Sequence, residues 1–383
     1  MTDEAADLRR WTRARTATAA VFAVHGAVGG NFASRIPTLK DGLHLSSGQL
    51  GLALVFPAVG AAAAMPLVAR INHRYGSRAT MRGLLTLWCA SLVLPALAPG
   101  LPWLCLALFG YGAAAGMADV SMNSHGTRLE EVTGRSTMSM LHGLWSVGVL
   151  AGAGAGVLAL RADLAVLPHF AAAAVVLMVI GWLSCAWLPD TRSAPQDEPP
   201  AAFAFPPRSA WLIGAVGFCA VFAEGAGSDW SGVYLRTVTG APATVGAASY
   251  AVFAGTMAVT RLVGDRLVQR VGAVRTVRMA GALATVGCAL IVIARTPPLA
   301  IAGFGLVGVG IAVVVPLAFA AAGHTGTHAS QAIAGVATVT YASGLVAPAV
   351  IGAVADISSL PVSFALVTAL VAVIAVAAGV LRR

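Results

Sequence analysis

The stretch LPVSFALVTALVAVIAVAAGVL, residues 360–381, decides the class of this protein because it contains no charged residue. About 20 apolar residues in an α-helix cross the roughly 30 Å hydrocarbon core of a bilayer. The rest of the chain is alike in composition, with 58% hydrophobic residues, 10% charged residues and a mean hydropathy of +0.83. A soluble surface needs roughly a quarter of its residues charged, so the composition predicts a membrane protein.

Apolar windows long enough to cross a bilayer recur along the whole sequence, and we mark twelve of them. Transmembrane β-strands would alternate in polarity over about ten residues, and the sequence has no such pattern. We therefore predict an all-α membrane protein with twelve transmembrane helices. The predicted spans are residues 16–36, 48–70, 79–98, 102–124, 137–160, 166–188, 209–230, 246–267, 277–295, 298–322, 329–354 and 360–381.

The basic residues predict the orientation of these helices. The net charge is +9, and arginines gather before the first span, after the second and eighth spans, and at the C-terminus. An even number of spans separates these segments, so they lie on one side of the membrane, which the positive-inside rule makes the cytoplasm. This placement accounts for the basic charge without nucleic acid. We expect a lipid-embedded, multi-pass protein of the bacterial cytoplasmic (inner) membrane with both termini cytoplasmic.

A polar segment and an internal repeat divide the chain into two halves. Residues 189–208, PDTRSAPQDEPPAAFAFPPR, are rich in proline and charge, which is typical of a linker. The halves on either side align at a constant offset of 196 residues, which indicates a duplication. We predict an N-terminal six-helix bundle, residues 1–188, a cytoplasmic linker, residues 189–208, and a pseudo-symmetric C-terminal six-helix bundle, residues 209–383.

The aligned landmarks resemble motifs of the major facilitator superfamily. The loop RINHRYGSR, residues 70–78, resembles its signature between helices two and three, and RLVGDRLVQRVG, residues 261–272, resembles the second copy. His73 stands where the family has an aspartate. The series GVLAGAGAG (148–156) and GLVAPAVIG (344–352) resemble the close-packing motif of the fifth helix. The resemblance implies the major facilitator fold, in which two bundles rock about a central site by alternating access.

A narrower resemblance lies in GYGAAAGMADVSMNSHG, residues 110–126. This glycine-rich segment, with an acid followed by an asparagine, is similar to the fucose-permease-like branch, which includes uncharacterised bacterial inner-membrane permeases. The resemblance implies proton symport of a sugar or another polar metabolite.

Two acids lie together in EGAGSDWSGVYL, residues 224–235, inside the seventh predicted span. A charge near the bilayer centre costs about 2.5–3.5 kcal/mol, so such acids face protein or a water-filled cavity. Five residues turn a helix by about 140°, so Glu224 and Asp229 point to different faces. We expect Glu224 to bind solute and to carry the coupling proton, and Asp229 to bind solute beside Trp230 at the outer gate. A structural hydrogen bond for Glu224 and interfacial water around Asp229 are the alternatives.

Polar residues of the first span lie at related depths. His25 lies near the depth of Glu224, and imidazole titrates near neutral pH, so we expect His25 to pair with Glu224, exchange protons and contact solute. Asn31 is a further expected solute ligand, and Arg35 is expected to anchor the helix at the membrane interface. Contact with an anionic solute is the alternative for Arg35. A packing role is the alternative for His25.

The fourth and fifth spans carry a second group of polar residues. Asp119 and Asn123 are four residues apart, and His142 and Trp145 are three apart, so each pair shares a helix face. We expect these four residues to line one wall of the solute cavity, with Asp119 and His142 as further proton-coupling candidates. A buried Asp–His pair that only joins two helices is the alternative.

Six residues near the cytoplasmic ends of the helices are expected to form a structural latch between the halves. Their charges and glycines occur at the ends of the second and eighth spans. They are Arg74, Gly76, Arg261, Asp265, Arg270 and Gly272.

Together these features predict a secondary active transporter for a small-molecule solute and protons, and not an enzyme. Proton-driven efflux of a small hydrophobic or toxic compound is the alternative direction. A receptor or scaffold that transports nothing is the alternative class. We expect a monomer with no cofactor. We also expect no metal site, because the histidines of HTGTH, residues 324–328, have no third ligand nearby in the sequence.

Overall fold

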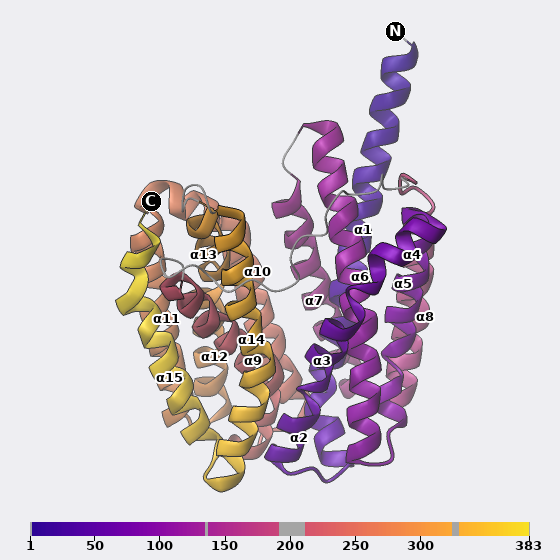
Figure 1. Cartoon of the computed structure of the whole chain (residues 1–383). Helices are drawn as coiled ribbons and strands as arrows, with labels where there is room; N and C mark the ends of the chain where they lie inside the picture. The colour runs from indigo at the N-terminus through magenta and orange to yellow at the C-terminus, as the bar shows by residue number, and fades with distance from the viewer. Residues whose placement is uncertain (1, 135–136, 191–210, 324–328, 383) are drawn as a thin grey trace. The chain divides into compact units, whose positions relative to one another are not determined.

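The computed structural model describes residues 2–134, 137–190, 211–323 and 329–382, which form helices joined by short turns and loops, with no β-strand among them (Figure 1). Within this described part, 11 helical segments are long and apolar enough to cross a membrane. They coincide with eleven of the twelve predicted spans, although some run further; the fourth continues to Thr133 and the seventh to Thr239. The prediction of an all-helical membrane fold is confirmed.

The predicted first span lies within α1 (Thr2–Gly42), which is not among the 11 segments. His25, Asn31 and Arg35 lower the hydropathy of this helix. All three side chains are buried within the helical bundle rather than facing lipid. The helix therefore exists as predicted, but its composition reflects contacts with protein.

The chain forms two compact units. Unit 1 comprises Met1–Leu39 and Phe56–Asp197, and unit 2 comprises Lys40–Val55 and Glu198–Arg383. The predicted linker lies outside the described residues from position 191 to its end, and the bundle boundaries stay predictions. Besides α1, the helices of unit 1 are α3 (Phe56–Ala64), α4 (Leu67–Tyr75), α5 (Ser77–Ser91), the 3-10 turn η1 (Leu94–Leu97), α6 (Leu101–Thr133), α7 (Met138–Arg161) and α8 (Val166–Cys185).

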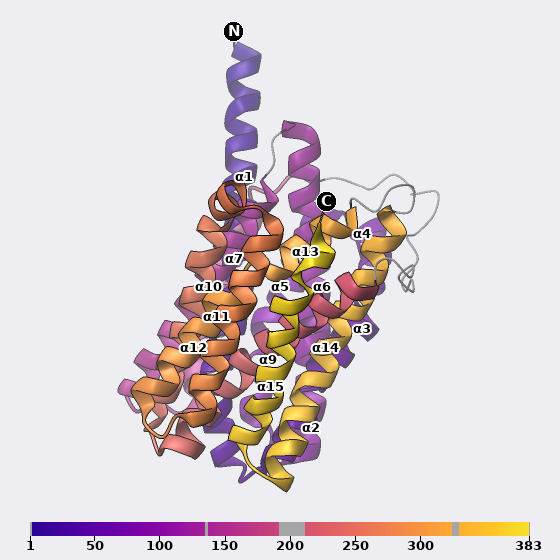
Figure 2. The same cartoon turned by 90° about the vertical axis from the view of Figure 1, so that its left-hand side faces the viewer.

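Unit 2 is built in the same way from long helices. Within it α11 packs beside α12 and α15, as the side view shows (Figure 2). Its helices are α2 (Ser47–Ala53), α9 (Trp211–Thr239), α10 (Ala243–Val271), α11 (Ala273–Ile293), α12 (Pro297–Ile311), α13 (Val314–Gly323), α14 (Ala329–Ile357), α15 (Leu360–Ala377) and the 3-10 turn η4 (Ala378–Leu381).

Two of the spans are broken into shorter helices near a proline. Pro57 lies in the first turn of α3 and Pro316 in the first turn of α13. Proline has no backbone N–H, so it cannot donate to the carbonyl four residues earlier and a helix breaks before it. In α12 and α13 the carbonyl left free in this way is that of Ala312.

The two copies of the repeated loop share one backbone geometry. Gly76, between α4 and α5, has φ 80° and ψ 159°, and Gly272, between α10 and α11, has φ 87° and ψ 152°. Positive φ values favour glycine because it has no Cβ. The two glycines are 196 residues apart, so the loops agree with the repeat inferred from the sequence.

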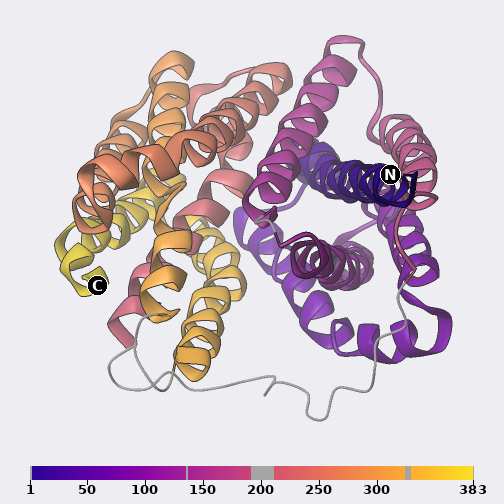
Figure 3. The same ribbon diagram turned by 90° about the horizontal axis from the view of Figure 1, so that it is seen from above.

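Glycines let α1 and α7 approach each other closely in unit 1. A Cβ at Gly26 or Gly30 of α1 would overlap the carbonyls of Trp145 and Val149, and a Cβ at Gly152 of α7 would overlap that of Ala27. Small residues allow this kind of packing between membrane helices. Figure 3 looks along the helices, with α1 in indigo seen end-on within unit 1. The glycine series recognised in the sequence is thus the contact surface of α7.

We expect Gly152→Ala to destabilise the protein, because the new Cβ would push the backbone of α1 away. Overpacking of this kind costs about 1–3 kcal/mol. Gly154→Ala is a matched control on the same helix, because nothing lies within 4 Å of a Cβ there. That control should unfold at the same temperature or slightly higher, since alanine favours helix by up to about 1 kcal/mol over glycine. Thermal unfolding in detergent measures both, and equal melting of the two variants contradicts the tight contact.

Candidate functional site

His25 joins four helices of unit 1. Its Nδ1 accepts a hydrogen bond from the indole Nε1 of Trp145 on α7 at 3.1 Å, and its Nε2 lies 3.3 Å from the Ala115 carbonyl on α6. Trp88 on α5 stacks on the imidazole, with ring centroids 5.2 Å apart, and donates to the backbone carbonyl of His25 at 3.2 Å. An indole N–H is only a donor, so Nδ1 carries no proton and the imidazole is neutral with its proton on Nε2.

The ring of Trp88 continues into a buried aromatic cluster. The Trp88 and Tyr111 centroids are 4.4 Å apart, and those of Tyr111 and Phe32 are 4.8 Å apart. Aromatic contacts of this kind add about 0.5–1.5 kcal/mol per pair beyond the burial of apolar area. The cluster packs against one face of the His25 imidazole through Trp88.

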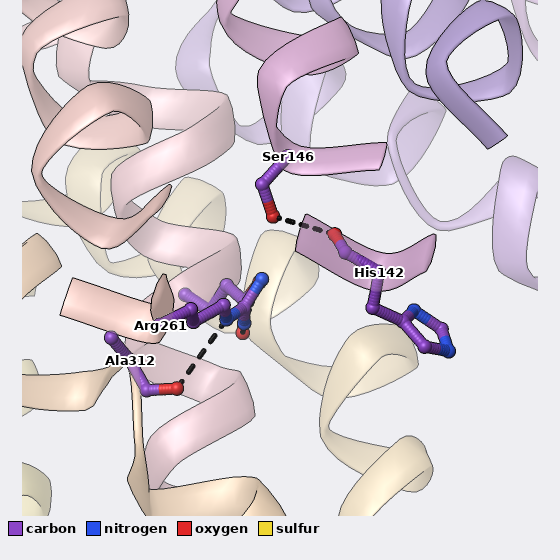
Figure 4. A network of polar contacts seen from close by, with 5 residues as sticks. His142, Ser146, Arg261 and Ala312 are labelled. Carbon is purple, nitrogen blue, oxygen red and sulfur yellow. Dashed lines mark hydrogen bonds and ion pairs between the residues drawn. The ribbon is translucent and has the colours of Figure 1, made fainter. Parts of the chain in front are cut away.

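Asp119, Asn123 and His142 lie in unit 1 at the edge of this core. Asp119 and His142 are both close enough to interact electrostatically with His25. The Asn123 amide donates to the Asp119 backbone carbonyl at 2.9 Å. His142 has an exposed ring that meets Phe22 edge to face at 5.4 Å, and its backbone carbonyl accepts from Ser146 at 3.1 Å (Figure 4). The four predicted wall residues, Asp119, Asn123, His142 and Trp145, therefore share one region of unit 1.

Asn31 and Arg35 belong to a buried network with His169 of α8. The Arg35 Nε donates to His169 Nδ1 at 3.2 Å, and another guanidinium nitrogen donates to the Leu164 carbonyl. His169 Nε2 then donates to the Asn31 Oδ1 at 2.9 Å, because its Nδ1 is the acceptor. Arg35 is only 1% exposed, so the expectation that it anchors the helix at the interface is wrong. A guanidinium with these partners lowers the cost of its burial by hydrogen bonding inside the bundle.

Glu224 of α9 is paired with Arg261 of α10 inside unit 2. One terminal nitrogen of Arg261 lies 3.1 Å from Oε1 and 3.2 Å from Oε2 of Glu224. The Nε of the same guanidinium donates to the Ala312 carbonyl at 3.4 Å, at the break between α12 and α13 (Figure 4). The side chains of Arg261 and Glu224 are 24% and 26% exposed, so the pair is largely covered by protein. The partner of Glu224 in unit 2 is thus an arginine, whereas we expected His25.

Asp229 and Trp230 lie one turn further along α9. The Asp229 carboxylate is half-buried and makes no hydrogen bond or ion pair with the residues that the structure describes. Trp230 is fully buried, and its indole N–H has no acceptor within the same described ranges, so it is not an interfacial side chain. Tyr250 on α10 interacts electrostatically with both Asp229 and Glu224. The two carboxylates therefore share a neighbour in spite of their different helical phase.

The predicted latch residues have different local surroundings within their own units. Arg74 lies over the ring of its neighbour Tyr75, 5.3 Å from the centroid, and Arg261 pairs with Glu224. Gly76 and Gly272 form the turns described above, and Arg270 is exposed near the end of α10. The side chain of Asp265 and the HTGTH motif lie outside the described part.

Asp190 contributes a contact near the first repeated loop that the sequence did not suggest. Its Oδ1 accepts the backbone N–H of Arg78 at 3.2 Å in the first turn of α5. A carboxylate at this position satisfies an otherwise unpaired helix donor and suits the positive end of the helix dipole. The loop is thus held by an acid that lies outside the RINHRYGSR motif.

A second carboxylate holds α2 in unit 2. Asp356 of α14 accepts from the Ser46 hydroxyl at 2.7 Å, and Ser46 is itself the N-cap of α2. Gly51 packs against the Pro348 carbonyl, and Arg236 pairs with Asp41 at 2.5 Å. These contacts explain why Lys40–Val55 belongs to unit 2. Ser46 and Gln49 form a capping box that could be read in the sequence, whereas Asp356 could not.

We expect His25→Gln to preserve the hydrogen bonds of His25, because the glutamine amide can accept from the Trp145 indole and donate to the Ala115 carbonyl. His25→Phe should destabilise the protein by about 1–3 kcal/mol, because the part-buried Trp145 N–H loses its acceptor. Thermal unfolding of the two variants measures this difference. Transport by the Gln variant should keep the pH dependence of the wild type; a changed pH profile with unchanged stability would show that His25 carries a proton.

The comparisons with known proteins agree with this architecture. Residues 18–326 match the family model of the Major Facilitator Superfamily. The chain is 33% identical over 379 residues to an uncharacterised transporter of Sinorhizobium fredii, covering 98% of this chain and 100% of that protein. It is 35% identical over 370 residues to an uncharacterised MFS-type transporter of Yersinia pestis, covering 96% of each.

Solved structures show the same fold at low sequence identity. A crystal structure of a variant of the nucleoside transporter NupG matches with a TM-score of 0.75 and 11% identity, covering 98% of this chain and 100% of that one. The human organic anion transporter MFSD10 matches with a TM-score of 0.69 and 15% identity, covering 97% and 99%. The family model and the two bacterial relatives place this chain among the transporters of the major facilitator superfamily.

Proposed function

We propose that this transporter is a proton-coupled symporter of a sugar or another small polar metabolite, with Glu224 as its coupling group. The observation that carries the proposal is the ion pair of Glu224 and Arg261 between two membrane helices. An ion pair in this setting requires desolvation of both charges, and it is disrupted when one partner loses its charge. Proton binding to Glu224 would therefore release the guanidinium, which links protonation to helix contacts or to solute binding.

A transporter needs groups that bind a polar solute as well as a coupling group. In unit 1, Asp119, His142 and Trp145 supply a carboxylate, an imidazole and an indole in one region. In unit 2, Asp229 and Tyr250 supply further polar groups near Glu224. Hydroxyl-rich solutes are bound by such donors and acceptors, and an indole ring offers an apolar face to a sugar. Asp119 and His142 are the second candidate pair for proton coupling.

The distribution of basic residues supports the orientation that we propose for the protein. We place it in the bacterial cytoplasmic membrane as a monomer, with both termini and the basic loops on the cytoplasmic side. Cysteine substitutions at Arg13 and Arg295, labelled from either side in vesicles, test this orientation. Labelling of the Arg13 position from outside intact cells would contradict it.

Transport assays with purified protein in proteoliposomes test the proposed activity. We expect uptake of at least one sugar or related polar solute, and faster accumulation when an inward proton gradient is imposed. A thermal-shift screen of sugars and hydrophobic cations selects the solutes to assay, because a ligand that binds the native state raises the melting temperature. If only hydrophobic cations stabilise the protein and a proton gradient drives their export, the proposal of symport is wrong and the protein is an efflux transporter.

We expect Glu224→Gln to abolish accumulation while leaving solute exchange intact. Glutamine keeps the shape and much of the hydrogen bonding of glutamate but cannot bind and release a proton, and exchange does not require that release. The inside-to-outside ratio should fall to one under a proton gradient, with counterflow near the wild-type rate. Asp229→Asn is the comparison and should slow both activities together. Normal accumulation by the Gln variant would move the coupling role to Asp119 and His142.

A further inference from the structure

The guanidinium of Arg261 is held at two places. Its terminal nitrogen contacts both oxygens of Glu224, and its Nε contacts the Ala312 carbonyl. A planar guanidinium that is bound through two different nitrogens has a fixed orientation, which a lysine ammonium cannot reproduce. The Ala312 carbonyl therefore determines how Arg261 faces Glu224.

The Ala312 carbonyl is available because of Pro316. In a continuous helix the N–H of residue 316 would donate to this carbonyl, but proline has no N–H. The next donor along the chain, the Leu317 N–H, bonds to the Val313 carbonyl at 3.3 Å. A carbonyl without a partner in a bilayer costs several kcal/mol, and a side-chain donor from a neighbouring helix can satisfy it. Arg261 fills this role at 3.4 Å.

We propose that Pro316 is a positioning residue for proton coupling. By freeing the Ala312 carbonyl, it anchors Arg261 against Glu224 and connects the state of that ion pair to the break between α12 and α13. This inference rests on the proposed function of Glu224. Among the side chains that the structure describes, Tyr250 on α10 is a further titratable group near Glu224, and it also interacts with Asp229 on α9. Neither α12 nor α13 contains a titratable residue, so these helices interact with Arg261 through the Ala312 carbonyl.

Pro316→Ala tests the inference without altering either charge. The new N–H can bond to the Ala312 carbonyl and close the helix, which takes the anchor away from Arg261. We expect accumulation under a proton gradient to fall to about one tenth or less, the equivalent of roughly 1.4 kcal/mol of coupling. Counterflow exchange should stay near the wild-type rate, whereas simple structural damage would lower both.

Pro298→Ala is the matched control, because Pro298 lies in the first turn of α12 and follows the non-helical residues 294–296, so its missing N–H interrupts no span. It should accumulate solute like the wild type. Arg261→Lys is a second test of the inference if Pro316→Ala does not fold. Lysine keeps the positive charge but cannot bind Glu224 and the Ala312 carbonyl through two different nitrogens. It should show the same selective loss of accumulation.

The outcomes separate the inference from the proposed function. If Glu224→Gln abolishes accumulation but Pro316→Ala and Arg261→Lys accumulate like the wild type, the inference is wrong and the coupling role of Glu224 stands. If Glu224→Gln accumulates normally, both are wrong. An equal loss in Pro298→Ala and Pro316→Ala also contradicts the inference.

Discussion

Every backbone polar group within the hydrocarbon core needs a hydrogen-bond partner inside the protein, and several buried side chains of both units supply or find partners in the same way. Arg35 binds His169 and a backbone carbonyl, and His25 accepts from one indole while its backbone accepts from another. The same requirement explains why Arg261 contacts the carbonyl that Pro316 leaves free. Functional and structural polar residues therefore use the same kinds of contact, and they differ in whether a partner can be exchanged for solute or proton.

By that criterion the two units differ in character. His25, Asn31 and Arg35 of α1 have hydrogen-bonding partners within unit 1, and the imidazoles of His25 and His169 each have a defined tautomer. On α9 and α10 the contacts are between charges, and Asp229 has no hydrogen-bonding partner among the residues described. The ion pair of Glu224 with Arg261 is therefore the observation on which we base the proposal that unit 2 carries the coupling group.

The apolar spans could be predicted from the sequence because each depends on local composition alone. The repeat was also readable, since Gly76 and Gly272 recur at a fixed offset and both need a positive φ. The partners of the polar residues could not be predicted from the sequence. Glu224 and Arg261 are 37 positions apart on different helices, and Arg35 and His169 are 134 positions apart. Helical depth indicates which residues can reach one another, but only the packing decides which do. Arg35 illustrates this, as an arginine near a predicted span end is as compatible with an interface as with a core.

The division of the chain into two units affects how two halves expressed as separate polypeptides would associate. Lys40–Val55 belongs to unit 2 although it precedes most of unit 1 in the sequence, and its capping by Asp356 and the ion pair of Asp41 with Arg236 hold it there. A chain cut at residues 191–210 would leave this segment on the N-terminal fragment and its binding surface on the other. Coexpressed fragments would then have a ready means of recognising each other, and the N-terminal fragment alone would expose a segment whose partner is missing.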